Sequence, residues 1–123
     1  MSKGKRILMI DDDALLCELT EEVLEGLGYD LVAALSVDEA REVFQRRDHG
    51  FDLIMVDHLL SGIHGEEHAA EFLRSCPGIP IALYTGAVVS LEEVRSKGIH
   101  AVIPKPLTRS ELAAAVEGAL RNR

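Results

Sequence analysis

Residues 52–57 have the sequence DLIMVD, in which four consecutive apolar residues stand between two aspartates. A short apolar run of this kind is typical of a strand that is buried on both faces of a parallel sheet. The predicted strand ends on Asp57, and Ser61, Gly62 and Gly65 follow it. Because ligands of α/β proteins bind beyond the carboxyl ends of parallel strands, Asp57 is the first candidate for a functional residue.

The composition fits one α/β domain with an aliphatic core. The chain has 123 residues, enough for a single hydrophobic core, and 47% of them are apolar. Aromatic residues make up only 4% and Trp is absent, so Val, Ile and Leu must fill the interior. The formal net charge of −8 argues against direct nucleic acid binding, which requires clustered Lys and Arg.

The cysteines and the N-terminal segment indicate a cytoplasmic protein. Cys17 and Cys76 lack the spacing of a metal site, and we expect both to be reduced, buried thiols. The apolar run at residues 7–10 stops at three aspartates and is too short for a signal peptide or a membrane span.

Apolar runs and helical patterns alternate along the chain. The runs predict five strands, at residues 7–10, 31–34, 53–56, 81–84 and 101–103. The helix after the first strand carries leucines at positions 15, 19 and 27 on one face, with Gly28 as its left-handed C-terminal cap. A hydroxyl residue with Glu three positions later marks three further helix starts, at residues 36–39, 90–93 and 108–111. Five strand–helix units predict one domain, residues 1–123, with a parallel sheet and helices on both faces.

Reactive side chains follow four of the five predicted strands. Asp11 and Asp12 follow the first, Asp57 ends the third, Thr85 follows the fourth and Lys105 comes shortly after the fifth. If the strands are parallel, these residues gather at one edge of the sheet despite their distance in sequence.

This combination favours phosphoryl transfer. Three neighbouring carboxylates repel one another unless a cation joins them, and hard oxygen ligands suit Mg²⁺. A carboxylate can attack phosphorus, while Mg²⁺, a lysine and a hydroxyl neutralise the transferred oxygens. A single Asp after a strand is more often a turn or helix-cap residue, which is the reading we give Asp13. The whole set at one edge makes that explanation inadequate for Asp57.

The pattern resembles the receiver domain of bacterial two-component response regulators, which has the flavodoxin-like, doubly wound (βα)5 fold of the single-domain chemotaxis regulator. The resemblance covers essentially the whole chain. The matching positions are the acidic pair Asp11 and Asp12, the phosphoacceptor Asp57, the Thr85-Gly86 pair and the Lys105-Pro106 pair, whose peptide bond is typically cis in this family.

The resemblance implies a signalling phosphoacceptor rather than an enzyme. A histidine kinase or phosphotransfer protein would pass a phosphoryl group to Asp57, and Thr85 and Lys105 would hold its oxygens. Their movement would shift the face formed by the fourth helix, the fifth strand and the fifth helix. The implied Mg²⁺ ligands are Asp12, Asp57, the backbone carbonyl of Leu59 and, through water, Asp11.

The chain departs from the family pattern at several positions. Val102 stands where an aromatic residue is usual, and residues 60–62, LSG, replace the common Met-Pro-Gly. His58 directly after the acceptor is similar to receivers attached to hybrid sensor kinases. Leu59 and Ala87 offer no polar group that could orient an attacking water, so we predict slow autodephosphorylation.

Two alternatives stay open. One is a receiver-like interaction module that is never phosphorylated, which the missing aromatic at Val102 favours. The other is a haloacid-dehalogenase-like phosphatase with Asp11 as its nucleophile, because Asp11 and Asp13 have its minimal spacing. That second fold usually needs a longer chain and leaves Asp57 without a role.

Other partners are only partly indicated. The sequence names neither the kinase nor a downstream target or fused output domain. The fourth and fifth helices could form a homodimer, although no clear apolar patch supports it. His64 and His68 are four residues apart but do not match the HExxH zinc motif, so we interpret them as the solvated start of the third helix.

Overall fold

The computed structural model describes residues 4–46, 50–57, 59–60, 63–75, 77–86, 88–105 and 108–121, with residues 59–60 and 63–66 described by their backbone alone. Several positions discussed above lie outside the described residues. They are His58, Ser61, Gly62, Cys76, Ala87 and Pro106.

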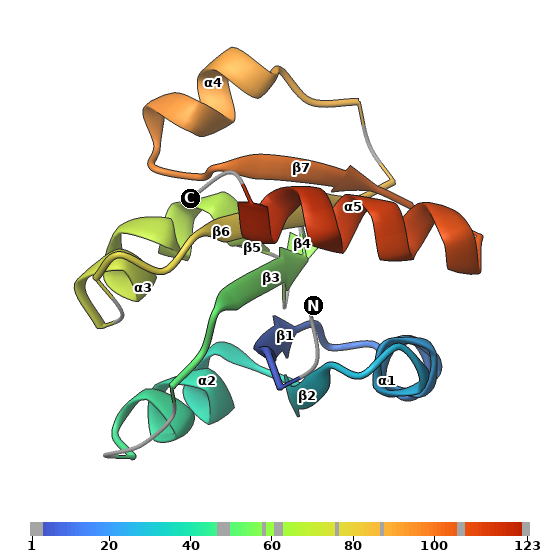
Figure 1. The fold of residues 1–123 in the computed structure, drawn as a ribbon. Coiled ribbons are helices and arrows are strands. Elements are labelled where there is room, and N and C mark those ends of the chain that lie inside the picture. The colour runs from blue at the N-terminus through green and yellow to red at the C-terminus, as the bar shows by residue number, and fades with distance from the viewer. Residues whose placement is uncertain are drawn as a thin grey trace.

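Five parallel strands form one sheet with the order β2-β1-β3-β6-β7 (Figure 1). The strands are β1 (Arg6–Ile10), β2 (Asp30–Ala34), β3 (Leu53–Asp57), β6 (Ile81–Thr85) and β7 (Ala101–Pro104). The segment that begins at residue 52 supplies the central strand, where Val56 of β3 lies between Ile10 of β1 and Leu83 of β6. This order is that of flavodoxin-like folds, so the predicted fold class is confirmed.

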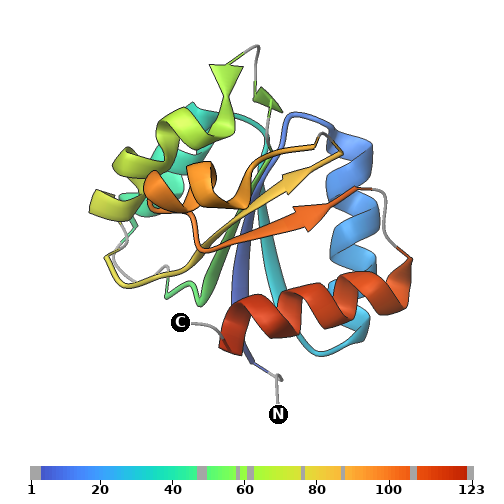
Figure 2. The same ribbon diagram turned by 90° about the horizontal axis from the view of Figure 1, so that it is seen from above.

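Five helices cover the two faces of the sheet (Figure 2). They are α1 (Ala14–Gly26), α2 (Val37–Phe44), α3 (Ala69–Ser75), α4 (Leu91–Ser96) and α5 (Arg109–Arg121). Helices α1 and α5 pack on one face, and α2, α3 and α4 pack on the other. Among the described helices, none is long and apolar enough to cross a membrane.

Successive residues of the strands enter two separate cores. In β1, Leu8 and Ile10 pack on the side of α2, α3 and α4, while Ile7 and Met9 pack on the side of α1 and α5. All four side chains are buried. Burial on both faces explains why the strand sequences are continuous apolar runs rather than alternating ones.

The helix ends have the predicted capping residues. Asp13 caps α1 by accepting a hydrogen bond from the N–H of Leu16, and Gly28 follows the helix with φ of 96°. Ser36 and Ser90 cap α2 and α4 through the N–H three residues on. These bonds satisfy N–H groups that the first helical turn leaves without a partner.

The buried face of α1 is not the predicted leucine face. Leu15 and Leu19 are 64% and 52% exposed, whereas Cys17, Thr20 and Leu24 are buried. Cys17 and Leu24 belong to the core on the α1 and α5 side of the sheet, so the helix face that carries them is the one turned inward. Leucine periodicity alone therefore gave the wrong face.

The segment after β3 contains structure that the sequence did not predict. A two-stranded antiparallel hairpin, β4 (Leu59–Leu60) and β5 (Ile63–His64), precedes a 3₁₀ helix, η1 (Gly65–His68). The helix expected from residue 65 becomes an α-helix only at Ala69. Strands of two residues are too short to show a hydrophobic period, so no sequence pattern marks them.

Candidate functional site

The carboxyl ends of β1, β3, β6 and β7 bring the candidate residues to one edge of the sheet. Asp11 follows β1, Asp57 ends β3, Thr85 ends β6 and Lys105 follows β7. Lys105 Nζ lies 3.1 Å from Asp11 Oδ2 and 2.9 Å from Asp57 Oδ1. The backbone N–H of Lys105 also donates to the carbonyl of Thr85 at 2.7 Å, which places Lys105 directly beside the end of β6.

Three carboxylates form a cluster at this edge. Ligand atoms of Asp11, Asp12 and Asp57 all lie within 4.8 Å of one another, and among the described side chains they are the one such group of metal-ligating type. Asp11 is buried, Asp57 is half-buried and Asp12 is exposed, so the cluster opens to solvent on the Asp12 side.

The cluster fits a small, hard cation. When all three carboxylates are ionised, the single ammonium of Lys105 leaves an excess of two negative charges. Oxygens that share one octahedral Mg²⁺ ion lie about 3.0 to 4.2 Å apart, and the ligand atoms of this cluster all lie within 4.8 Å of one another. Carboxylate oxygens are also the ligand type that Mg²⁺ prefers.

Asp11 is held from several directions. Its Oδ1 accepts the N–H of Asp13 at 2.9 Å, and Cys17 Sγ lies 3.5 Å from its backbone carbonyl oxygen. Burial raises the pKa of Asp11, although the bonds from Asp13 and Lys105 oppose that shift. Burial, reinforced by the nearby carboxylates, raises the pKa of Cys17 to about 12, so its thiol stays protonated. Cys17 is thus the buried, reduced thiol that we expected.

Lys105 is a firmly held ammonium. Burial alone would lower the pKa of Lys105, but hydrogen bonds to Asp57 and Asp11 outweigh it, and the net shift is upward. Its side chain is only 21% exposed. The ammonium also stands 4.8 Å from the centre of the Tyr84 ring.

Sequence reasoning missed Tyr84. Its ring is buried on the α1 and α5 side of the sheet, and its hydroxyl is hydrogen-bonded to Thr20 of α1. The available signal was an aromatic residue next to Thr85 in an otherwise aliphatic strand. Burial raises the pKa of the Tyr84 phenol, so the ring stays neutral.

An open groove of about 450 Å³ adjoins the site. Its walls come from α1, α5 and the ends of β6 and β7. The lining residues include Leu16, Leu19, Val23, Tyr84, Lys105 and Leu112.

Three other positions from the sequence analysis, Leu59, Val102 and His68, lie in separate elements of the fold. Leu59 begins β4, two residues after Asp57. Val102 lies in β7 and packs against the core on the side of α2, α3 and α4. His68 is half-buried and not solvated as we expected, because its ring packs against that of Phe72 with the two ring centres 6.0 Å apart.

Known proteins share this architecture. A family model described as Response regulator receiver domain matches residues 7–117. The chain is 34% identical over 119 residues to the DNA-binding response regulator MtrA of Mycobacterium tuberculosis, across 95% of this chain and 51% of that protein. It is 31% identical over 117 residues to the transcriptional regulatory protein ZraR of Escherichia coli, across 93% of this chain and 26% of that protein.

Solved structures agree with the sequence comparison. A response regulator receiver domain protein (CheY-like) from Methanospirillum hungatei has a TM-score of 0.82 at 28% identity, across 95% of this chain and 94% of that one. The chain spans about half the length of the MtrA relatives that it matches.

Proposed function

This chain belongs to the response regulator receiver domain family, and we propose that Asp57 accepts a phosphoryl group from a histidine kinase or a phosphotransfer protein. The observation that carries the proposal is the bridge of Lys105 between Asp57 and Asp11, beside an acidic cluster that opens to solvent. An aspartate at a strand end that served only as a turn residue would need neither the buried partner carboxylate nor the ammonium.

The proposed step is a transfer between two side chains. A carboxylate oxygen of Asp57 attacks the phosphorus of a phosphohistidine on the partner. The O–P bond forms as the P–N bond breaks, and the electron pair leaves with the imidazole. The product is an acyl phosphate on Asp57, and this chain acts as a phosphoacceptor rather than as an enzyme with turnover.

A bound Mg²⁺ would lower the cost of bringing a negatively charged phosphoryl group to an acidic cluster. The residues proposed to hold the ion are Asp12, Asp57 and the backbone carbonyl of Leu59, with Asp11 acting through water. The carboxylate spacing and the excess negative charge support this assignment.

Lys105 and Thr85 are proposed to bind the transferred phosphoryl oxygens. Lys105 already lies 2.9 Å from an oxygen of the acceptor, and its backbone is tied to Thr85. When both side chains turn toward the phosphoryl group, the ends of β6 and β7 are pulled together, and the surface of α4, β7 and α5 shifts. We place this signalling in the cytoplasm, where histidine kinases obtain ATP.

The groove beside Lys105 is proposed to receive the phosphodonor domain. It reaches Lys105, and its lining residue Leu19 is an exposed apolar side chain on α1. A Leu19→Arg substitution should slow transfer from a phosphorylated kinase or phosphotransfer domain while leaving phosphorylation by acetyl phosphate unchanged. If Leu19→Arg left the rate of transfer from the phosphorylated domain unchanged as well, the groove would not be the docking site.

The function is tested with Mg²⁺ and a small donor. Wild type, Asp57→Asn and Asp52→Asn are incubated with acetyl phosphate, and the phosphorylated fraction is measured by intact-protein mass. Asp52→Asn is a matched control, because it changes the aspartate just before the same strand at the opposite sheet edge. We expect labelling of wild type and Asp52→Asn and none of Asp57→Asn.

Other outcomes identify the alternatives. Hydrolysis that survives Asp57→Asn and is lost with Asp11→Asn would indicate a phosphatase. The absence of any response to acetyl phosphate and to beryllofluoride in wild type would indicate a module that works without phosphorylation.

A further inference from the structure

We infer that Tyr84 is a positioning residue for Lys105, with its aromatic ring acting as the ammonium's third partner in the phosphoryl transfer proposed above. This inference rests on the proposed function, because it concerns the lysine that would bind the phosphoryl group. It assigns a role to the buried tyrosine at the site that the reaction itself does not use.

The Lys105 ammonium has three described partners. An ammonium carries three N–H groups that can point to separate acceptors. Two of them face Asp11 Oδ2 at 3.1 Å and Asp57 Oδ1 at 2.9 Å. On another side stands the Tyr84 ring, 4.8 Å away, within the range in which a cation is attracted to an aromatic face.

The proposed reaction changes two of these three partners. Asp57 would become an acyl phosphate, and a cation held by the acidic cluster would compete with the ammonium for the charge of Asp11. The Tyr84 ring takes no part in the proposed transfer, so its attraction for the ammonium does not depend on the charge of either carboxylate. A lysine side chain has four flexible methylenes, so a fixed partner limits where the ammonium can go.

Tyr84 is built to stay in place. The side chain is 4% exposed, and its backbone pairs with Asp57 of β3 and Ile103 of β7. Its hydroxyl is hydrogen-bonded to Thr20, which anchors the far end of the ring to α1. Tyr84 and Lys105 both line the groove, so the ring and the ammonium are neighbours on its wall.

The first test measures the initial rates at which Tyr84 variants are phosphorylated by acetyl phosphate with Mg²⁺. Tyr84→Phe keeps the aromatic face, and we expect it to retain most of the rate. Tyr84→Leu removes the face, and its rate should fall about 5- to 30-fold, the range for a desolvated cation–aromatic contact. If the leucine variant does not fold, Tyr84→Met replaces it, because methionine also lacks a ring and fills irregular space well.

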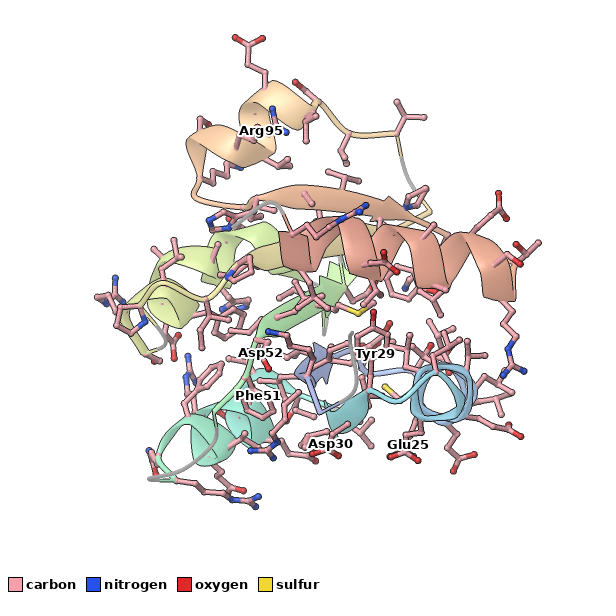
Figure 3. The ribbon with its side chains drawn as sticks, viewed as in Figure 1. Glu25, Tyr29, Asp30, Phe51, Asp52 and Arg95 are labelled. Atoms are coloured by element: carbon pink, nitrogen blue, oxygen red, sulfur yellow. The ribbon has the colours of Figure 1, made fainter. Side chains whose placement is uncertain are left out.

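Tyr29→Leu is the matched control. Tyr29 is the protein's other tyrosine, is 5% exposed and packs in the same core (Figure 3). It directly precedes β2, whereas Tyr84 lies near the carboxyl end of β6. It should lose stability like Tyr84→Leu and keep the wild-type rate per folded molecule. A matching fall in the Tyr29→Leu rate would attribute the effect to the core and overturn the inference.

The second test asks whether Tyr84 acts through Lys105. In a Lys105→Met background, Tyr84→Leu should produce no further loss, because the ammonium that it positions is gone. A purely structural role would lower the rate by the same factor in both backgrounds. The NMR signals of the Lys105 ε-methylene supply an independent readout, since a ring at this distance shifts them upfield.

We expect the upfield shift in wild type and Tyr84→Phe, with and without beryllofluoride, and its loss in Tyr84→Leu. An unshifted methylene in wild type, or a Tyr84→Leu rate equal to wild type, would refute the inference while leaving the phosphoacceptor function intact. Failure of wild type to take up phosphoryl at all would instead refute the proposed function.

Discussion

At the level of single residues, the positions two after Asp57 and two after Thr85 in the sequence bear on how long a phosphoryl group would survive. Leu59 and Ala87 stand two positions after Asp57 and Thr85 and cannot hydrogen-bond an attacking water. We predict that the aspartyl phosphate persists well beyond seconds. Leu59→Asn supplies an amide that can orient water, so it should speed hydrolysis about tenfold or more. The increase should stay below the roughly 10²- to 10⁴-fold rate contribution of a general base.

The decay of the phosphorylated fraction after removal of the donor measures this effect. Leu60→Asn changes the neighbouring residue of β4 and should leave the decay unaltered. Rapid hydrolysis in wild type, or equal acceleration by both substitutions, would show that water is oriented by some other group.

Single residues also mark the limit of what sequence can predict about the site. Asp11, Asp57 and Lys105 were identifiable because each follows an apolar strand, and parallel strands end at one edge. Tyr84 was not, because its importance comes from the direction of its ring and from its contacts with Lys105 and Thr20. A one-dimensional pattern contains no information about either.

At the level of secondary structure elements, α5 begins with a complete capping box. Thr108 Oγ1 accepts the N–H of Glu111 at 3.2 Å, and Glu111 Oε1 accepts the N–H of Thr108 at 2.9 Å. Thr108→Ala removes the cap and should lower the free energy of unfolding by about 1 kcal/mol. Urea denaturation measures this change. Ser110→Ala, two residues after Thr108, keeps the cap and should change the free energy of unfolding little.

Helices α2 and α3 are joined by an ion pair with a testable pH dependence. Arg41 binds both carboxylate oxygens of Glu71, and this hydrogen bonding lowers the pKa of Glu71 below its ordinary value of 4.5. A carboxyl whose folded-state pKa is lowered adds stability above its unfolded pKa and loses it as the pH falls through the folded one. Glu71→Gln should therefore lower the urea midpoint at neutral pH and have little effect in acid.

The size of that effect is expected to be small, because both side chains reach solvent and surface pairs contribute little. Glu117→Gln serves as the comparison, since Glu117 forms a longer, more exposed pair of 3.8 Å with Arg121. Its effect on the midpoint should be smaller still. An equal difference between wild type and Glu71→Gln at all pH values would rule out the ion pair as the cause.

At the level of the whole molecule, the strand–helix alternation made the fold predictable. Continuous apolar runs occur because the three inner strands, β1, β3 and β6, are buried on both faces. Parallel pairing follows from the intervening helices. The face of α1 was misjudged because Thr20, a polar residue, is buried through its bond to Tyr84 while Leu15 is exposed. The hairpin after Asp57 went unseen because its strands have two residues each.

The stability of the whole domain should depend on Mg²⁺ through the acidic cluster. Asp11, Asp12 and Asp57 repel one another within 4.8 Å, a cost that the folded state bears when no cation is bound. Without Mg²⁺, Asp12→Asn should unfold at a higher temperature than wild type, because it removes one charge of the cluster.

Adding Mg²⁺ should reverse this difference. At about ten times its dissociation constant, a ligand of the folded state adds about 1.4 kcal/mol of stability, and Asp12→Asn should gain much less than wild type. Asp13→Asn is the control, because Asp13 caps α1, asparagine caps equally well, and its carboxylate lies outside the cluster. Thermal melts with and without Mg²⁺ decide the matter. Equal stabilisation of wild type and Asp12→Asn would mean that the ion binds elsewhere, since the loss of this carboxylate weakens any cation site in the cluster.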